Sequence, residues 1–440
     1  MIKITKAVED VMKRDRRVMF TTTKEDIPFV VQRGERDHAW DIAGNRYIDF
    51  SSFIGVYNLG VNGNAEIRKA AKEQIDRLMH SAFLDYYAEL PVSFAESLVG
   101  MMPKGFGRVF WSNSGTEAIE DAIKLARIFT KKYYMMGFYN SFHGRSMGSL
   151  GLTSSKVSGR KHFGPFPHAI HAIYPNPYRP MFGASDPDDY AMACIDYIER
   201  NIFARECSSD EIAAIVFEPV QGEGGYVVPP KLFIKELRKL ATENNILLVA
   251  DEIQSGYMRT GKFLACEHFG ITADIYAMAK ALGGGMPIGA TIAKTNLGDT
   301  PPGSHAGTFG GNLVSMAAGY ASIKYLRRNK RNLESMAREK GRYMLKRLEE
   351  MKDRYEMVGD VRGLGMMLAA ELVKDKKSKE PAIKERKEVL MECFRNGLVM
   401  LPCGVSTIRV IPPITMLKEN VEKGLDIFED AIAKVSGRKK

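Results

Sequence analysis

Three groups of residues have side chains suited to chemistry. Lys280 stands alone between an apolar segment and three glycines in DIYAMAKALGGGMPIGA (274–290). Asp251 and Glu252 end the apolar segment ILLVADE (246–252). An unpaired carboxylate is costly to bury, so we expect a positive group beside at least one of the two. Ligands of open parallel sheets bind at the carboxyl ends of strands, so we predict that Asp251 and Lys280 face one site.

The third group is a polar helix start. The segment RVFWSNSGTEAIEDAIKLAR (108–127) passes from an apolar strand through Ser114, Gly115 and Thr116 into a helix. Backbone N–H groups at this start, with the hydroxyls of Ser114 and Thr116, are suited to hold a phosphate. Such a segment on its own is more often an ordinary helix cap.

The three groups together match one cofactor. Pyridoxal phosphate needs an amine for a Schiff base, a carboxylate that keeps its ring nitrogen protonated, and an anchor for its phosphate. Lys280, Asp251 and the segment at Ser114–Thr116 supply these in turn.

The elements that must position these residues form a repeating pattern. Between about residues 105 and 295, short β-rich segments alternate with helical ones. This alternation predicts an α/β fold with a mostly parallel central sheet and helices on both faces. Residues 313–355 are helical in pattern, and strands follow in GDVRGLGMMLAAELV (359–373) and LVMLPCGVSTIRVIPP (398–413).

The termini are expected to form a second, smaller α+β domain. DHAWDIAGNRYIDFSS (37–52) has the pattern of a hairpin with its turn at residues 43–45. We therefore predict a large cofactor-binding domain over residues 57–325, and a small domain built from residues 1–56 and 326–440.

Composition narrows the class of protein. The 440 residues are 45% hydrophobic, but no apolar run approaches the roughly 18 residues of a membrane helix, and the N-terminal residues lack a signal-peptide core. Five scattered cysteines argue against disulfides and structural zinc, and the pair His168 and His171 lacks partners at metal-ligand spacing. The net charge of +10 is spread along the chain, which favours a basic surface over a nucleic-acid site. We expect a cytoplasmic protein without metal, membrane or nucleic-acid partners.

The sequence also resembles a known family from about residue 35 to 430. It is similar to the class-III, fold-type-I pyridoxal-phosphate aminotransferases, and within them to the 4-aminobutyrate and ornithine branch. The motifs that carry the resemblance occur in the family's order: SNSGTEA (112–118), FHGR (142–145), EPVQGEGG (218–225), DEIQSGYMRTG (251–261), MAKALGGGMPIG (278–289), GTFGGN (307–312) and VRGLGMM (361–367).

The resemblance implies roles at the cofactor. Lys280 looks like the Schiff-base lysine and Asp251 like the partner of the ring nitrogen. The other cofactor contacts that it implies are Ser114, Gly115 and Thr116 at the phosphate, Phe142 on the ring face, His143, Glu218, Gln254 at the 3-oxygen, and Thr308. In the family, the threonine at the position of Thr308 reaches the phosphate of the neighbouring subunit. This implies a homodimer, or a multiple of it, with shared active sites.

The resemblance also implies substrate contacts. Arg145 matches the position that grips a substrate carboxylate, and Arg409 the one that receives the α-carboxylate of a keto acid. Glu223 matches the acid that screens this second arginine while an ω-amino acid is bound. Ile54 belongs to SSFIGVYNLG (51–60), near the place where the family shapes its substrate pocket.

Two departures from the family pattern concern the substrate. GVNGN (60–64) stands where the family has Gly-His-x-His-Pro, and Leu313 stands where it has a proline. The sequence therefore predicts an aminotransferase that moves an amino group from an ω-amino acid to 2-oxoglutarate or pyruvate in two half-reactions. An amino-acid racemase on the same scaffold is the alternative.

Overall fold

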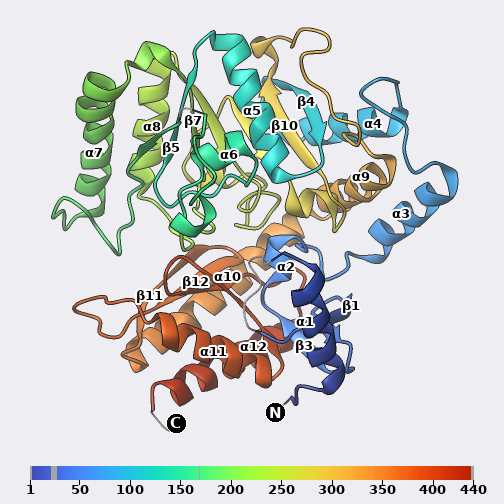
Figure 1. The fold of residues 1–440 in the computed structure, drawn as a ribbon, viewed down its shortest axis with the longest axis vertical. Coiled ribbons are helices and arrows are strands. Elements are labelled where there is room, and N and C mark those ends of the chain that lie inside the picture. The colour runs from blue at the N-terminus through green and yellow to red at the C-terminus, as the bar shows by residue number, and fades with distance from the viewer. Residues whose placement is uncertain (1, 21–26, 168, 438–440) are drawn as a thin grey trace. The chain divides into compact units, whose positions relative to one another are not determined.

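The structure is a computed structural model that describes residues 2–20, 27–167 and 169–437. The chain divides into two compact units (Figure 1). Unit 1 comprises the described residues of Met1–Asn64 and Ser335–Lys440, and unit 2 comprises those of Ala65–Glu334. Both termini belong to unit 1, as expected for a small domain built from the two ends of the chain. Within the described residues, every helix is too short or too polar to cross a membrane.

Unit 2 is built on one central sheet with the strand order β4-β10-β9-β8-β7-β5-β6. Its strands are β4 (Phe106–Ser112), β5 (Tyr134–Phe138), β6 (Ala169–Ala172), β7 (Ile212–Phe217), β8 (Leu247–Asp251), β9 (Ile275–Met278) and β10 (Gly289–Lys294). The strands β6, β5, β7, β8 and β9 pair in parallel, whereas β10 runs antiparallel to both β9 and β4. The predicted mostly parallel sheet is confirmed.

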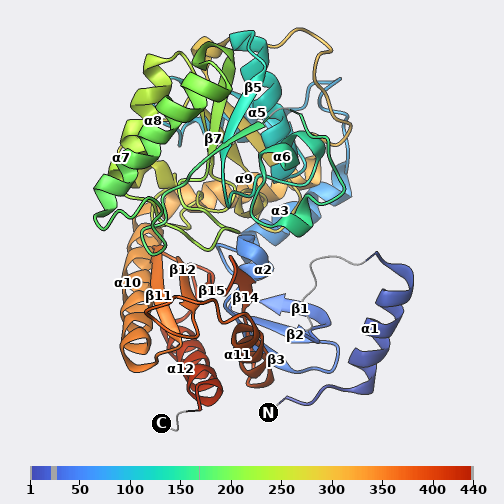
Figure 2. The same cartoon turned by 60° about the vertical axis from the view of Figure 1, so that its left-hand side comes forward.

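Helices bury this sheet. Each residue of β7 and of β9 is buried, which requires cover on both faces because successive side chains point to opposite sides. The helices of the unit are α3 (Ala65–Arg77), α4 (Glu89–Val99), α5 (Gly115–Thr130), α6 (Met147–Leu152), α7 (Pro187–Tyr197), α8 (Lys231–Glu243) and α9 (Leu313–Arg328). In Figure 2, α7 and α8 lie side by side at the upper left.

Helix α5 shows how sequence and packing agree. Its apolar residues recur at helical spacing, and Ala118, Ala122 and Ala126 are buried in the core that α5 forms with the central strands. Ser114 caps the first turn, and Lys131 ends the helix in the left-handed conformation. This packing places the first turn of α5 at the carboxyl edge of the sheet.

Unit 1 contains two small sheets. One has the order β1-β2-β3-β13 and the other β11-β12-β15-β14. Their strands are β1 (Val31–Glu35), β2 (His38–Asp41), β3 (Arg46–Asp49), β11 (Val358–Leu364), β12 (Met367–Leu372), β13 (Leu398–Val399), β14 (Leu401–Cys403) and β15 (Thr407–Val410). Strands β2 and β3 form the predicted hairpin. Its turn is held by the Asp41 carboxylate, which accepts hydrogen bonds from the N–H groups of Ala43 and Asn45.

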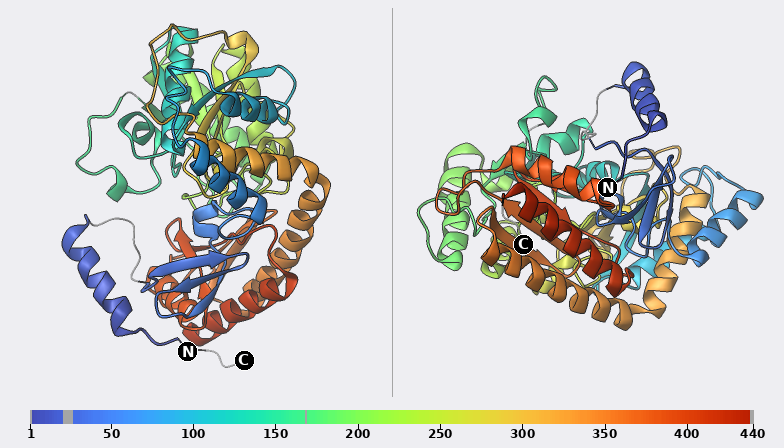
Figure 3. Two further views of the ribbon diagram at one scale, coloured as in Figure 1. Left: turned by 90° about the vertical axis from the view of Figure 1, so that its right-hand side faces the viewer. Right: turned by 90° about the horizontal axis from the view of Figure 1, so that it is seen from below.

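The helices of unit 1 are α1 (Lys6–Val18), α2 (Ser52–Gly55), α11 (Ile383–Arg395) and α12 (Lys418–Val435). Figure 3 shows α11 and α12 as neighbouring red helices seen from below. The helical stretch expected over 313–355 is divided into α9 and α10 (Lys330–Arg354) by Asn329. The Asn329 side chain donates to the carbonyl of Tyr325, as a residue that ends a helix commonly does. The boundary between the two units falls within α10, after Glu334.

Candidate active site

The ends of β8 and β9 bring Asp251 and Lys280 to the same edge of the sheet. Asp251 is in register with Ala277 of β9, and the N–H of Glu252 donates to the Ala277 carbonyl at 2.9 Å. Lys280 follows directly after β9 ends and opens a short 3₁₀ turn, Lys280–Gly283. Asp251 and Lys280 therefore lie at the ends of two adjacent parallel strands, and that they face one site stays a prediction.

Lys280 has an unusual backbone conformation. Its φ is +48°, in the left-handed region that side chains other than glycine seldom occupy. The glycines that follow, Gly284 and Gly285, also have positive φ, which glycine adopts without strain. A strained residue is retained when the surrounding structure fixes it, and such residues concentrate at functional sites.

The positive group expected beside the two carboxylates is His143. Its Nδ1 lies 2.8 Å from Oδ2 of Asp251, and both side chains are buried. Burial alone lowers the pKa of His143, but the hydrogen bond and charge of Asp251, together with the charge of Glu218, more than offset this and raise it. His143 is therefore the buried hydrogen-bond partner of Asp251. Glu252 instead accepts hydrogen bonds from the Ser255 hydroxyl at 2.6 Å and from the N–H of Cys266 at 2.9 Å.

Glu218 is a second buried carboxylate in this region. Its two oxygens accept hydrogen bonds from the N–H groups of Phe142 at 2.9 Å and Gly222 at 2.8 Å. Burial and the nearby Asp251 raise the pKa of Glu218 to about 7, against the opposing effects of His143 and the two N–H donors. Glu218 thus holds the backbone at Phe142, next to the histidine that pairs with Asp251.

Gln254 has a buried amide oxygen close to this turn. A Cβ built on Gly222 would lie 3.0 Å from Oε1 of Gln254, so the two residues are closely packed. Among the described residues, this Oε1 has no hydrogen-bond partner, and neither has Nε2 of His143. Buried polar atoms without partners are uncommon and point to a group that binds beside them. A pyridine ring whose N–H pairs with Asp251 and whose hydroxyl donates to Oε1 of Gln254 fits these groups.

The phosphate end of the site is the start of α5. The first-turn N–H groups of a helix have no acceptor within the helix, so they are available to an anion. Gly115 permits close packing against the Asp251 turn, because a Cβ there would lie 2.9 Å from Cδ1 of Ile253. A Cβ on Gly289 would collide with the Ser114 carbonyl oxygen. The helix start is thereby held against both β10 and the segment that follows Asp251.

The two hydroxyls of this helix start are engaged within the protein. Ser114 Oγ accepts from the N–H of Glu117 at 3.3 Å, as an N-cap does. Thr116 Oγ1 lies 2.7 Å from Ser146 Oγ and 2.6 Å from Ser149 Oγ, and accepts from the N–H of Arg145 at 3.1 Å. In the structure, Thr116 therefore fixes the loop that carries His143 and Arg145.

Glu120, a carboxylate that is not among the predicted site residues, completes this arrangement. Glu120 Oε1 accepts hydrogen bonds from Ser146 Oγ at 2.5 Å and from the N–H of Ser149 at 2.9 Å. Glu120 and Thr116 are four residues apart on α5, so their side chains lie on one face of the helix. That spacing was the available signal, but only the fold shows that the face meets residues 145–149.

The predicted substrate residues of unit 2 lie on loops around this core. Arg145 is exposed, and its Cζ lies 5.3 Å from the ring centroid of Phe142. Glu223 follows Gly222 in the turn that Glu218 holds. Thr308 is exposed on the long loop between β10 and α9.

Two predicted substrate residues belong to unit 1. Ile54 has a φ of +67° in α2, and its side chain is exposed. Positive φ at a β-branched residue is strained, as at Lys280. Arg409 lies on β15 and is buried; its Nε and Nη2 donate to the carbonyl of Pro402 at 3.1 and 2.6 Å.

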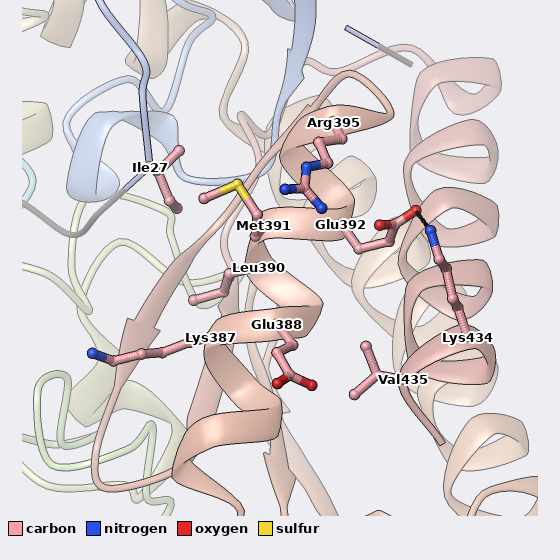
Figure 4. Close-up of a pocket in the computed structure, with 9 residues that line it drawn as sticks. All are labelled: Ile27, Lys387, Glu388, Leu390, Met391, Glu392, Arg395, Lys434 and Val435. Atoms are coloured by element: carbon pink, nitrogen blue, oxygen red, sulfur yellow. Dashed lines mark hydrogen bonds and ion pairs between the residues drawn. The ribbon is translucent and has the colours of Figure 1, made fainter. Parts of the chain in front are cut away.

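A surface pocket of unit 1 is separate from these residues. It has a volume of about 530 Å³ and contains the Glu392–Lys434 ion pair of 2.7 Å between α11 and α12 (Figure 4). None of the predicted site residues lines it. Within the described part of the chain, no cluster of three metal-ligating side chains is present. His168, of the pair considered for a metal, lies outside the described residues.

Comparison with known proteins gives consistent matches along the chain. Residues 19–432 match the aminotransferase class-III family. The chain is 37% identical to a leucine/methionine racemase of Thermococcus litoralis, over 97% of this chain and 96% of that one. It is 35% identical to the 5-aminovalerate aminotransferase of Pseudomonas aeruginosa, over 97% and 99% of the two chains. A solved amine transaminase of an uncultivated Pseudomonas species, in a form that contains pyridoxal phosphate, is 27% identical with a TM-score of 0.88, covering 95% and 98%.

Proposed function

Since the chain belongs to the class-III aminotransferases, it is a pyridoxal-phosphate-dependent transaminase, and we propose that it uses an ω-amino acid as donor and a 2-keto acid as acceptor. Donors of this kind resemble 4-aminobutyrate or ornithine, and the acceptor is 2-oxoglutarate or pyruvate. The observation that carries the proposal is Arg145, an exposed guanidinium beside the Phe142 ring. A guanidinium there is suited to bind the carboxylate at the far end of a donor, away from its reacting amine.

The contacts of the described residues support this proposal at the cofactor. The start of α5 binds the phosphate, Phe142 packs on the ring, and Gln254 bonds its oxygen. Asp251, fixed by His143, holds the proton on the ring nitrogen. The Lys280 amine would hold the cofactor through its aldehyde carbon, with release of water, and would carry a proton to and from the donor carbon. When bound, pyridoxal phosphate supplies an electron sink that makes this proton acidic.

A panel of donors and acceptors tests the proposed substrate class. We expect 4-aminobutyrate, 5-aminovalerate or ornithine to give higher kcat/KM than leucine or alanine with the same keto acid. Loss of the keto acid and formation of the new amino acid are measured together. A preference for plain α-amino donors would contradict the ω-amino proposal.

An amino-acid racemase is the second candidate, and the 37% identity to the leucine/methionine racemase favours it. A racemase removes the α-proton and adds one to the opposite face while the amine stays on the same molecule, so it needs no keto acid. Incubation of L-leucine or L-methionine without keto acid, followed by chiral chromatography, separates the two functions. Sustained formation of the D-isomer over many turnovers would favour the racemase.

The role of Arg145 gives a prediction on substrate binding. We expect Arg145→Gln to raise KM for a carboxylate-bearing donor by about tenfold or more, because an amide cannot replace a charged, bidentate contact. A primary amine of the same length without a carboxylate serves as the matched substrate control. Its KM should change by less than about threefold. Equal losses for both donors would remove Arg145 from carboxylate binding.

We further propose a homodimer, or a multiple of it, with shared sites and a cytoplasmic location. The surface beside Thr308 supports the dimer. Phe309 is exposed and lies against His80 with ring centroids 5.1 Å apart, and the Asn312 side chain donates to the Met79 carbonyl. Exposed apolar side chains near these contacts include Ile75, Leu78, Met79, Tyr86 and Tyr87. This number of exposed apolar side chains in two neighbouring stretches of the chain favours an interaction site. The five cysteines are buried thiols, as expected in a reducing compartment.

The proposed role of Thr308 gives a prediction on the cofactor. We expect Thr308→Val to weaken the binding of pyridoxal phosphate by about tenfold, because valine keeps the shape but loses the hydroxyl that bonds the charged phosphate. Fluorescence titration of the apoprotein measures this affinity. Light scattering at the assay concentration provides the control, and a fully active monomer would contradict the shared site.

A further inference from the structure

The loop that joins β10 to α9 carries Thr308 and is exposed along most of its length. It is the gold loop between these two elements in Figure 1. Between residues 301 and 309, every residue is exposed except His305, whose side chain is 15% exposed. Thr308 lies on the same stretch, so its position depends on what holds the loop.

The far end of this loop is held by close packing. A Cβ on Gly310 would meet the Trp111 carbonyl oxygen at 2.5 Å, and a Cβ on Gly311 would meet the Phe83 ring at 2.6 Å. Asn312 caps α9. These contacts fix the chain after Thr308 but leave the residues before it to another anchor.

His305 is such an anchor, because its side chain contacts both helix α5 and strand β4. Its Nε2 hydrogen bonds to the buried carboxylate of Asp121 on α5, and its Nδ1 lies 3.0 Å from Nζ of Lys124. Its ring stacks on Phe110 of β4, with centroids 4.5 Å apart and planes at 27°. Three contacts from one side chain therefore join the loop to α5 and β4.

The chemistry of these partners fixes the direction of the hydrogen bonds. An ammonium group has only donors, so Nδ1 of His305 accepts from Lys124. A neutral imidazole then carries its proton on Nε2 and donates it to Asp121. The Asp121 side chain is 4% exposed, and a buried carboxylate that loses such a donor is strongly disfavoured. The chain Lys124–His305–Asp121 therefore favours one position of the loop.

We propose that His305 is a positioning residue that anchors the loop 298–312 to α5 and so places Thr308 for the cofactor phosphate. The proposal rests on the shared-site role of Thr308 proposed above. In the proposal, His305 contacts neither the cofactor nor the substrate. It acts only by fixing the position of the loop. His305 precedes Thr308 in the chain, and Gly310 and Gly311 follow it. Thr308 is therefore held from both sides.

The first experiment measures the loop itself. Hydrogen exchange, followed by mass spectrometry on the full-length protein at saturating pyridoxal phosphate, reports on peptides that cover residues 299–309. We expect faster exchange there in His305→Ala, while His305→Gln stays close to wild type because its amide can still donate to Asp121. Asp299→Ala is the control on the same loop, since its 3.4 Å ion pair with Arg108 is exposed and contributes little. Unchanged exchange in His305→Ala would overturn the anchoring role.

The second experiment separates this inference from the function on which it rests. We expect His305→Ala to raise the dissociation constant of pyridoxal phosphate by about tenfold, and His305→Gln and Asp299→Ala by less than about threefold. In the double variant with Thr308→Val, His305→Ala should add less than about threefold, since the hydroxyl that it positions is gone.

Each outcome gives a decision. If Thr308→Val binds pyridoxal phosphate more weakly but His305→Ala binds it normally, the positioning role of His305 is overturned and the proposed function is left intact. Normal binding by Thr308→Val overturns its phosphate role, and this inference with it. Fully additive losses in the double variant also overturn the inference, because His305 would then act on the cofactor by a route that does not pass through Thr308.

Discussion

Replacing Lys280 with alanine is expected to remove the absorption band of covalently bound pyridoxal phosphate and to lower turnover by about a millionfold or more, as for other covalent catalytic groups. In the proposed function the Lys280 amine binds the cofactor and moves the proton, and alanine has neither capability. Alanine and lysine share the same Cβ, so the backbone strain at this position is unchanged. The substitution therefore tests the loss of the amine without a change in backbone strain.

Absorption spectra, turnover and thermal melting are compared for this variant. Lys324→Ala, at an exposed position of α9, is the matched control for loss of a lysine and should behave as wild type. Normal transamination by Lys280→Ala would contradict the central assignment of this residue.

Replacing Asp251 with asparagine is expected to leave the cofactor bound while slowing proton transfer by about 10² to 10⁴. A neutral amide does not stabilise the proton on the ring nitrogen. The substitution also removes the carboxylate whose hydrogen bond and charge raise the pKa of His143, so that pKa is expected to fall. Both changes weaken the charge arrangement at the ring nitrogen.

Stopped-flow absorption of the first half-reaction measures this rate directly. Asp274→Asn is the matched control. Asp274 is a buried aspartate directly before β9, and it forms ion pairs with Arg238 and Lys294. We expect this control to melt at a lower temperature but to react within about threefold of wild type. A rate that close to wild type in Asp251→Asn would show that it is not the ring partner.

Much of the fold could be predicted because its signals are local. The turn at Ala43–Asn45 and the capped start of α5 depend on residues that are close in sequence. The parallel order of the strands follows from alternation of strand and helix. Two buried carboxylates at the end of β8 also predicted a positive partner. Local patterns of this kind are set by backbone geometry and side-chain period.

The partners themselves were beyond reach of local patterns. His143 and Asp251 are separated by 108 positions, and Glu120 meets Ser146 only because α5 packs beside their loop. The hydroxyl of Thr116 has the right type for phosphate binding, yet it is hydrogen-bonded to Ser146 and Ser149. Only the folded chain decides which of several possible acceptors a short polar side chain reaches.

The left-handed backbone at Lys280 has a consequence for how the protein tolerates change. A glycine at this position would adopt φ of +48° without the strain that a Cβ imposes, which costs of order 1 kcal/mol. Lys280→Gly would therefore remove the proposed Schiff-base amine and relieve backbone strain at the same time. Selection for thermal stability alone would favour glycine at position 280, whereas selection for catalytic activity would retain the lysine. At this turn, robustness and activity oppose each other within a single residue.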